Sequence, residues 1–199
     1  MKIYVDFDRT LFDCDKFLDD FYLLINRYNI SKDLFRECQN QCRKDGFNPY
    51  NILNLVKEKY EFDDELLNEI GMLIKNSANY LYQDTISFLE YLKLRNYEIV
   101  ILTKGNSDYQ REKIFNAHLD SYYHKLIVTM KHKGFLKLDF QNSIFIDDNP
   151  VEIQSIMKKN PKMLIRMERN DSKYSNIPLD IYVKEVKSLR EIIDNKILD

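Results

Sequence analysis

Two carboxylates stand one residue apart near the amino terminus of the chain. In MKIYVDFDRTLFD, Asp6 and Asp8 follow an apolar run, and Thr10 adds a hydroxyl group. A second acidic pair, Asp147 and Asp148, ends another apolar run, SIFIDD, late in the chain. Because an unpaired charge is costly to bury, acids at the ends of core segments need a cation or a chemical role.

Phosphoryl transfer is the chemistry that suits such acids. Carboxylates that gather in one place repel one another unless a cation lies among them, and hard oxygen ligands favour Mg²⁺. One aspartate can attack phosphorus and form an aspartyl-phosphate, while a second moves the protons of the leaving oxygen and the hydrolytic water. A hydroxyl and an ammonium group can bind the phosphate oxygens, where charge develops. Thr103, together with Lys131 or Lys133, could supply these two groups.

Short apolar runs alternate with helical patterns and predict the elements that position these side chains. The runs lie at 2–7, 97–103, 125–129, 143–148 and 162–167, with a candidate sixth run at 180–183. They are nearly continuous and rich in β-branched residues, as is typical of strands buried on both faces of a parallel sheet. Asp84, Ser107 and Asn149 are placed to cap the helices between them. The pattern predicts an α/β fold with a doubly wound, mainly parallel sheet, whose ligands bind beyond the carboxyl ends of the strands.

The segment 14–81 breaks this alternation. Its apolar residues, such as Phe17 and Phe21, recur at helical spacing, and no run within it resembles a strand. We therefore expect an all-helical insertion of roughly four helices. The α/β catalytic core would then consist of 1–13 and 82–199.

In this order, DFDRTLF, ILTKG, a lysine and IFIDDNP resemble the motifs of the haloacid dehalogenase (HAD) superfamily, specifically its D-x-D-x-T phosphatase branch. The strands that carry these motifs span nearly the whole predicted core. The insertion is similar in position as well, because the superfamily places its helical C1-type cap just after the first strand. The resemblance implies a Rossmann-like core with a cap domain and Mg²⁺-dependent hydrolase chemistry.

The resemblance also implies a role for each residue of the first motif. Asp6 would be the nucleophile and a Mg²⁺ ligand. Asp8 would be the general acid and base, and its main-chain carbonyl would bind the metal. Thr10 would hold the motif loop in shape.

The later motifs would bind phosphate and metal. By the same resemblance, Thr103 would bind the transferring phosphate, with the amide of Lys104 beside it. Asp148 aligns as the direct metal ligand, and Asp147 as its partner acid, directly or through water.

Two positions leave alternatives open. Lys133, just before Gly134, is the favoured phosphate-binding lysine, but Lys131 could serve instead. Glu152 matches a further acid that some members carry beside the metal. Its spacing from Asn149 explains it equally well as a helix-capping residue.

Substrate selectivity would come from the cap, whose one loose loop spans 44–51. The candidates for substrate contact flank this loop: Arg43, Phe47, Asn48 and Tyr50. A solvated turn would explain them as well. The three histidines are scattered along the sequence, and we assign none of them a catalytic or metal-binding role.

Composition excludes several other classes of protein. The 199 residues carry a net charge of −2 with acids and bases interleaved, so no basic surface for a nucleic acid polymer or an anionic membrane is expected. No apolar run approaches the length of a membrane helix, and the start lacks a signal-type segment, so we expect a cytoplasmic protein. Cys14, Cys38 and Cys42 lack a nearby fourth metal ligand, and we interpret them as reduced thiols.

Together these observations predict a Mg²⁺-dependent phosphatase that hydrolyses a small phosphorylated metabolite through an aspartyl-phosphate. A phosphomutase of the same superfamily and a phospho-accepting signalling module of the receiver type are the alternatives. In receivers the acid pair follows the first strand, whereas here the adjacent pair comes last. The sequence leaves the identity of the substrate and the oligomeric state open.

Overall fold

The computed structural model describes residues 1–58, 60–62, 64–169, 173–174, 177–179 and 183–198, and for Arg43 the backbone alone. Its centre is a six-stranded sheet in the order β3-β2-β1-β4-β5-β6, in which every neighbouring pair is parallel. The strands are β1 (Lys2–Val5), β2 (Glu98–Lys104), β3 (Lys125–Thr129), β4 (Ile144–Asp147), β5 (Met163–Met167) and β6 (Lys184–Val186). The predicted α/β fold is therefore confirmed.

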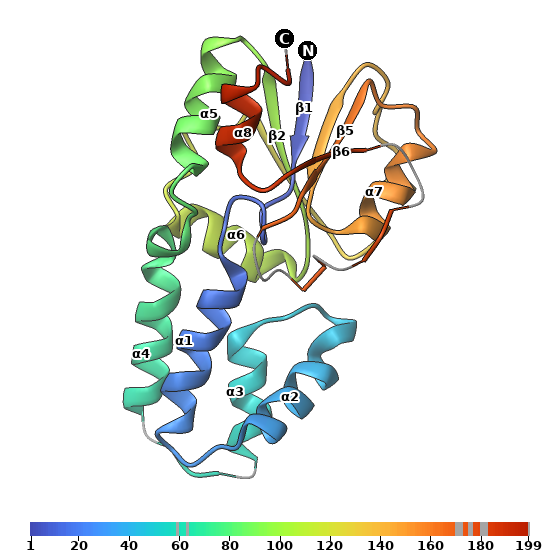
Figure 1. The fold of residues 1–199 in the computed structure, drawn as a ribbon. Coiled ribbons are helices and arrows are strands. Elements are labelled where there is room, and N and C mark those ends of the chain that lie inside the picture. Colours follow the sequence, from blue (N-terminus) through green and yellow to red (C-terminus); the bar gives the residue numbers. More distant parts are fainter. Residues whose placement is uncertain (59, 63, 170–172, 175–176, 180–182, 199) are drawn as a thin grey trace.

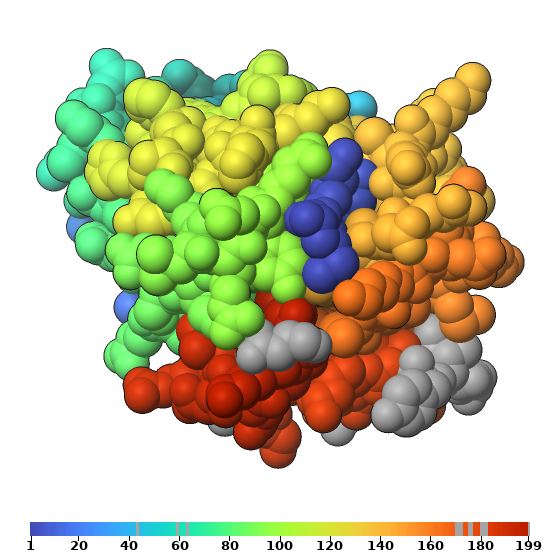
Figure 2. Space-filling model, turned by 90° about the horizontal axis from the view of Figure 1, so that it is seen from above, coloured from blue at the N-terminus to red at the C-terminus, as the bar shows by residue number. Residues whose placement is uncertain are grey.

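The first strand lies in the middle of the sheet. Ile3 of β1 pairs with Ile99 of β2 on one side and with Ile144 of β4 on the other. Seen from above, the blue N-terminal residues lie between green residues on one side and orange residues on the other (Figure 2). Of the candidate strand at 180–183, only Val183 belongs to the described residues, and β6 begins one residue later.

Helices cover both faces of the sheet because its side chains alternate between them. On the face of Ile3 and Val5 lie α5 (Thr85–Leu94), α6 (Ser107–Asn116) and α8 (Leu189–Asp194). On the face of Tyr4 lies α7 (Pro150–Met157), which buries Ile153 and Ile156 against Tyr4 and its neighbours. This arrangement is the expected doubly wound sheet.

The helix caps correct part of the sequence prediction. Asn149 caps α7 as expected, because its side chain accepts a hydrogen bond from the amide of Val151. Helix α6 begins one residue earlier than expected, with Asn106 as its cap in place of Ser107. Asp84 precedes α5 but makes no capping bond, since its carboxylate is bound elsewhere in the fold.

The helical insertion between β1 and β2 is confirmed. It contains α1 (Cys14–Asn26), α2 (Lys32–Gln41), η1 (Cys42–Lys44), α3 (Pro49–Lys57), α4 (Asp64–Lys75) and η2 (Ser77–Tyr80). Figure 1 shows α1–α4 beyond the carboxyl ends of the strands, at the end of the molecule opposite the two termini. The boundaries of the insertion, between residues 13 and 14 and between residues 81 and 82, stay a prediction. Within the described residues, no helix is long and apolar enough to cross a membrane.

Candidate active site

Three carboxylates meet at the carboxyl ends of β1 and β4. Asp6 follows β1, Asp147 ends β4, and Asp148 follows it, so the pairing of the two strands brings them together. Each offers an oxygen that lies within 4.8 Å of the others, and all three residues are buried. Two acidic pairs far apart in the sequence therefore contribute to one cluster.

Lys133 lies between two of these acids. Its Nζ donates to Oδ1 of Asp6 and to Oδ2 of Asp147, each at 2.6 Å, and its side chain is only 1% exposed. Lys131 is exposed, and its amide donates to the hydroxyl of Thr129 instead. Of the two candidate lysines, the structure thus brings Lys133 to the acids.

Gly134 explains how Lys133 reaches this position. A Cβ atom at residue 134 would lie 2.2 Å from the carbonyl oxygen of Ser155 in α7, so only glycine fits at this position. The amide of Gly134 also donates to the Ser155 hydroxyl at 3.1 Å. The short helix η3 (Lys133–Phe135) is therefore packed directly against α7, with the side chain of its first residue buried.

The acid cluster has the electrostatics of a cation site. Burial, opposed by Lys133 and assisted by Asp147, raises the pKa of Asp6 to about 7. Burial and the charge of Asp147 also raise the pKa of Asp148 well above its ordinary value. Oδ2 of Asp148 is buried and accepts no hydrogen bond from the described residues. These residues fit a divalent metal, because a hard cation would satisfy this oxygen and offset the repulsion among the acids.

The bonds within the cluster indicate which acids would hold the metal. Both oxygens of Asp147 already accept hydrogen bonds, one from Lys133 and one from the amide of Asn149 at 2.8 Å. Asp6 binds Lys133 through Oδ1, and Asp148 has the oxygen without a donor. We therefore expect Asp6 and Asp148 to be the direct carboxylate ligands.

Asp8 has two partners that the sequence did not reveal. Gln110 Nε2 donates to Oδ2 of Asp8 at 2.6 Å, and Lys113 Nζ donates to Oδ1 at 2.5 Å. Both come from α6, and the side chain of Lys113 is 2% exposed, with its Nζ 4.7 Å from the ring centre of Phe12. Burial alone would raise the pKa of Asp8, but Lys113 and Gln110 together lower it. Asp8 is therefore ionised at neutral pH in this arrangement.

Among the described residues, Glu152 neither makes a helix-capping bond nor belongs to the three-acid cluster, and a role beside the metal stays a prediction. Its Oε2 accepts from the backbone amide of Lys133 at 2.7 Å, and its Oε1 lies 2.8 Å from Nδ1 of His132 and 3.1 Å from Nζ of Lys104. The carboxylate thus fixes the backbone of Lys133 and connects it to Lys104.

The two motif threonines are both buried. The hydroxyl of Thr103 has no hydrogen-bond partner among the described residues and lines the cavity at the acids. The hydroxyl of Thr10 also lacks a partner there, so its side chain does not tie the motif loop by a hydrogen bond. The loop is held through its backbone, since the amides of Leu11 and Phe12 donate to the carbonyl of Phe7.

A cavity of about 220 Å³ opens at the acid cluster. The four motif acids, Thr103, Lys104 and Lys133 line it, whereas Thr10 and Lys131 do not. Its remaining described lining residues are Arg9, Asn149, Glu152 and Tyr174. Every described lining residue other than Tyr174 has a charged or polar side chain, which favours a small hydrophilic ligand.

Known structures share this arrangement of sheet and insertion, although no protein-family profile and no curated protein matches the sequence. A protein from Burkholderia xenovorans LB400, described as a haloacid dehalogenase-like hydrolase, matches with a TM-score of 0.76 over 96% of this chain and 94% of that chain, at 17% identity. The fold is HAD-like.

Two further HAD structures match over nearly their full length. The HAD-hydrolase YfnB from Bacillus subtilis, in a form bound to magnesium, has a TM-score of 0.66 and 17% identity over 98% of this chain and 97% of that chain. The L-2-haloacid dehalogenase from Xanthobacter autotrophicus, with chloropropionic acid covalently bound, has a TM-score of 0.64 and 14% identity over 96% and 97%. The helical insertion of this chain has the position of a C1-type cap.

The loop of the HAD-like cap touches the core at Gly46. With φ at +80°, a Cβ atom at this residue would lie 2.3 Å from the backbone nitrogen of Asn106, in the loop after β2. Asn106 Nδ2 also donates to the carbonyl of Asp45 at 3.2 Å. The cap loop and the core loop therefore meet backbone to backbone.

The candidate substrate residues of the cap lie beside α6. Phe47 packs on the ring of Tyr109, and the Tyr50 hydroxyl donates to Glu112 at 3.4 Å. Asn48 caps α3 through the amide of Tyr50. In this arrangement Phe47, Asn48 and Tyr50 do not line the cavity, and the side chain of Arg43 is not among the described atoms. Substrate contact by these four residues therefore stays a prediction.

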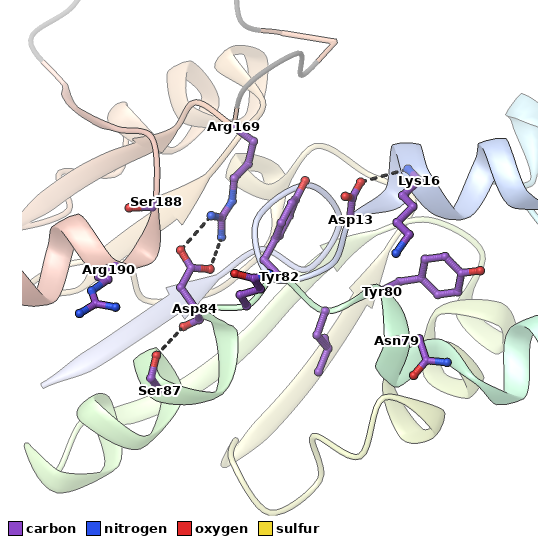
Figure 3. A pocket seen from close by; sticks show the side chains of 12 residues that line it. Asp13, Lys16, Asn79, Tyr80, Tyr82, Asp84, Ser87, Arg169, Ser188 and Arg190 are labelled. Carbon is purple, nitrogen blue, oxygen red and sulfur yellow. Dashed lines mark hydrogen bonds and ion pairs between the residues drawn. The ribbon is translucent and has the colours of Figure 1, made fainter.

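Arg169 connects the motif loop to the segment that enters α5. Its guanidinium donates to both oxygens of Asp84 at 2.8 and 2.9 Å and to the carbonyl of Thr10 at 2.9 Å. It also stacks on Tyr82, 3.9 Å from the ring centre. Tyr82, Asp84 and Arg169 border a hollow of about 610 Å³ between the start of α1 and the start of α8 (Figure 3).

Arg169→Lys is expected to lower the free energy of unfolding by about 1–2 kcal/mol, because lysine cannot bind Asp84 through two nitrogens and reach Thr10 as well. Urea denaturation measures this loss. Arg190→Lys is the matched control, since Arg190 borders the same hollow but its side chain is exposed and, among the described residues, forms its ion pair with Asp194 of its own helix. Equal losses in the two variants would contradict the role of Arg169.

Proposed function

We propose that the protein is a Mg²⁺-dependent phosphatase that hydrolyses a small phosphorylated metabolite through an aspartyl-phosphate intermediate. The observation that carries this proposal is the convergence of Asp6, Lys133 and Thr103 on one polar cavity, with Asp8 beside them. A nucleophile, a cation, a phosphate-binding hydroxyl and a second acid are what the reaction needs. The magnesium-bound HAD-hydrolase of the same fold supports the choice of metal.

In the first half of the reaction, Asp6 attacks phosphorus. Lys133 holds Oδ1 of Asp6 and keeps the carboxylate oriented toward the cavity. A bond forms between Asp6 and phosphorus while the bond to the ester oxygen breaks, and that oxygen takes a proton from Asp8. When bound, the metal screens the negative charges of carboxylate and phosphate from each other.

In the second half, water releases the phosphate. Asp8 takes a proton from the water that attacks phosphorus, and the bond between phosphorus and Asp6 breaks. Lys113 favours the ionised form of Asp8, which suits this step directly. For the first step Asp8 must bind a proton, so we expect substrate binding to weaken the ion pair with Lys113.

Asp8 also distinguishes phosphate esters from haloacids as substrates. A halide leaves without a proton, whereas the alkoxide of a phosphate ester needs a general acid. Two buried side chains, Gln110 and Lys113, donate hydrogen bonds to Asp8 and hold its carboxylate in place. This second acid favours phosphatase over dehalogenase chemistry.

The test is phosphate release from p-nitrophenyl phosphate and from a panel of phosphorylated metabolites, with and without Mg²⁺. We expect sustained turnover that requires the metal, and none above background in Asp6→Asn, which lacks the nucleophile. Asp19→Asn, in the exposed part of α1, is the matched control and should retain activity.

Four outcomes would overturn the proposal. They are absence of turnover with every divalent metal, stoichiometric labelling without release, transfer of phosphate within the substrate, and metal-independent halide release from a 2-haloacid. The second outcome would indicate a receiver-type module, the third a mutase and the fourth a dehalogenase.

A further inference from the structure

Tyr174 reaches the acid cluster from outside all the sequence motifs. It follows β5, far along the chain from the residues that suggested phosphoryl transfer, and its side chain lines the same cavity as Asp6 and Asp148. Among the described lining residues it is the one aromatic side chain. No pattern in the sequence pointed to it.

A buried arginine fixes the backbone of Tyr174. Arg166 of β5 donates from Nη2 to the carbonyl oxygen of Tyr174 at 2.5 Å and from Nη1 to Glu185 of β6 at 3.0 Å. The side chain of Arg166 is only 3% exposed. The position of Tyr174 is therefore set by a strand of the core.

Asn149 fixes the other end of the tyrosine. Its Nδ2 lies 3.4 Å from the Tyr174 hydroxyl and donates to it. Its Oδ1 accepts from the amide of Val151 at 3.0 Å, and this capping bond sets which way the amide group points. Because Asn149 directly follows Asp148, the phenol hydroxyl is placed next to the acid cluster.

Burial and the nearby acids favour the neutral form of the hydroxyl. Burial, followed by the charge of Asp148, raises the pKa of Tyr174, with smaller contributions from Asp147 and Asp6 and an opposing one from Arg9. A neutral phenol is a hydrogen-bond donor. An anionic oxygen of a ligand in this cavity could accept from it, because phosphate oxygens accept strong hydrogen bonds.

We propose that the hydroxyl of Tyr174 donates a hydrogen bond to a non-bridging oxygen of the substrate's phosphoryl group. The phosphorus must lie beside Asp6 at the end of the central strand β1. Thr103 reaches it from the β2 side, and Tyr174 from the β4 and β5 side. Tyr174 is thus a substrate-binding residue; this inference rests on the proposed phosphatase function.

Tyr174→Phe tests the inference, because it retains the ring and removes only the hydroxyl. We expect inorganic phosphate to bind the Mg²⁺-loaded variant about ten- to a hundredfold more weakly than it binds the wild type. Titration calorimetry measures this affinity without any turnover. For the hydrolysed ester, KM should rise by a similar factor, with a smaller change in kcat.

Tyr123→Phe is the matched control. It removes a phenol hydroxyl that donates to Asp120 at 2.9 Å, outside the lining of the cavity, and should leave phosphate affinity and KM unchanged. A Tyr174→Phe variant with wild-type phosphate affinity would overturn the inference, even if its stability fell. So would a wild-type protein that binds no phosphate.

The inference and the proposed function fail separately. If the wild-type protein hydrolyses no ester, the phosphatase proposal is wrong, yet the calorimetric comparison still decides whether Tyr174 binds phosphate. If hydrolysis occurs and Tyr174→Phe changes neither KM nor phosphate affinity, only the inference fails.

Discussion

Lys133→Met is expected to lower the free energy of unfolding of the metal-free protein by about 3–5 kcal/mol and to abolish phosphate release. The ammonium group of Lys133 makes 2.6 Å contacts with both Asp6 and Asp147, and all three side chains are at most 8% exposed. Methionine fills a similar volume without charge, so the loss reports two buried carboxylates left without their cation. Phosphate release should fail because neither Asp6 nor the phosphate would retain this positive charge.

Lys131→Met is the control that separates the two lysines of the motif. Lys131 is exposed, so its replacement should change the free energy of unfolding by less than about 0.5 kcal/mol and leave turnover intact. Urea denaturation in EDTA and an assay of phosphate release measure the two effects. Loss of activity in Lys131→Met, with activity retained in Lys133→Met, would show that Lys133 is not the phosphate-binding lysine.

Added Mg²⁺ is expected to recover part of the stability of Lys133→Met. The cation would supply positive charge beside Asp6 and Asp148, although it would not replace the bonds that Lys133 makes to Asp147. Stabilisation by Mg²⁺ in the wild type that disappears in the variant would mean that Lys133 is needed to form the metal site. Either result is read from the same denaturation curves.

The metal-free protein is expected to become less stable as the pH rises from about 4 to about 7, by about 4 kcal/mol in total from Asp6 alone. The pKa of Asp6 rises from 3.8 to about 7 on folding, with burial as the main cause. Above its ordinary pKa, the unfolded chain loses this proton while the folded chain keeps it. Deprotonation therefore favours the unfolded state until the pH passes the folded pKa.

Three other acids of the protein affect its stability in a different pH range. Asp8, Asp84 and Glu152 have lowered pKa values in the folded protein, so their contribution is lost only as the pH falls below their ordinary values of 3.8 to 4.5. Between about pH 5.5 and about pH 7.5 the trend should therefore follow the raised acids, with a loss of about 2 kcal/mol from Asp6.

Urea denaturation at these two pH values, in EDTA and in excess Mg²⁺, measures the effect. Mg²⁺ binds the deprotonated acids, so it should stabilise the protein more at the higher pH and remove the trend. Asp6→Asn carries no titrating proton at this position and should show a smaller trend in EDTA, to which Asp147 and Asp148 still contribute. Stability that rises between the two pH values in metal-free wild type would contradict the raised pKa of Asp6.

The sequence predicted those residues whose position depends on the ends of parallel strands. Asp6, Thr103 and Asp148 each follow an apolar run, and parallel pairing then places them at one edge of the sheet. Only the end of each strand places these residues, whatever the register along it. Small errors in the predicted strand bounds therefore leave the positions of these residues unchanged.

The partners that act across elements could not be predicted. Lys113 and Gln110 reach Asp8 because α6 packs on the face of β1, and Arg169 reaches Thr10 from the end of β5. Such pairs depend on how helices and loops pack, which leaves no periodic signal in a single sequence. The sequence of α6 held one hint of these partners. Gln110 and Lys113 stand one turn apart on the buried face of the helix, beside Tyr109 and Ile114.

Glu152 shows how tertiary contacts override a local pattern. Its spacing after Asn149 suggested a helix cap, but the amide of Lys133 and the side chains of His132 and Lys104 surround its carboxylate instead. The backbone amide of Asn149, which a capping glutamate would bind, donates to Oδ1 of Asp147 instead.

The central position of β1 has a consequence for the order of folding. This strand of four residues precedes the whole helical insertion in the sequence, yet Lys2 pairs with Glu98 and Ile3 with Ile144. Both pairings close long loops, so the chain must collapse around distant segments before β1 gains a partner. We expect slow refolding, and no early intermediate in which Asp6 and Asp148 are together. A metal that needs both acids would then leave the folding rate unchanged and slow unfolding instead, so its effect would appear as a longer lifetime of the native state.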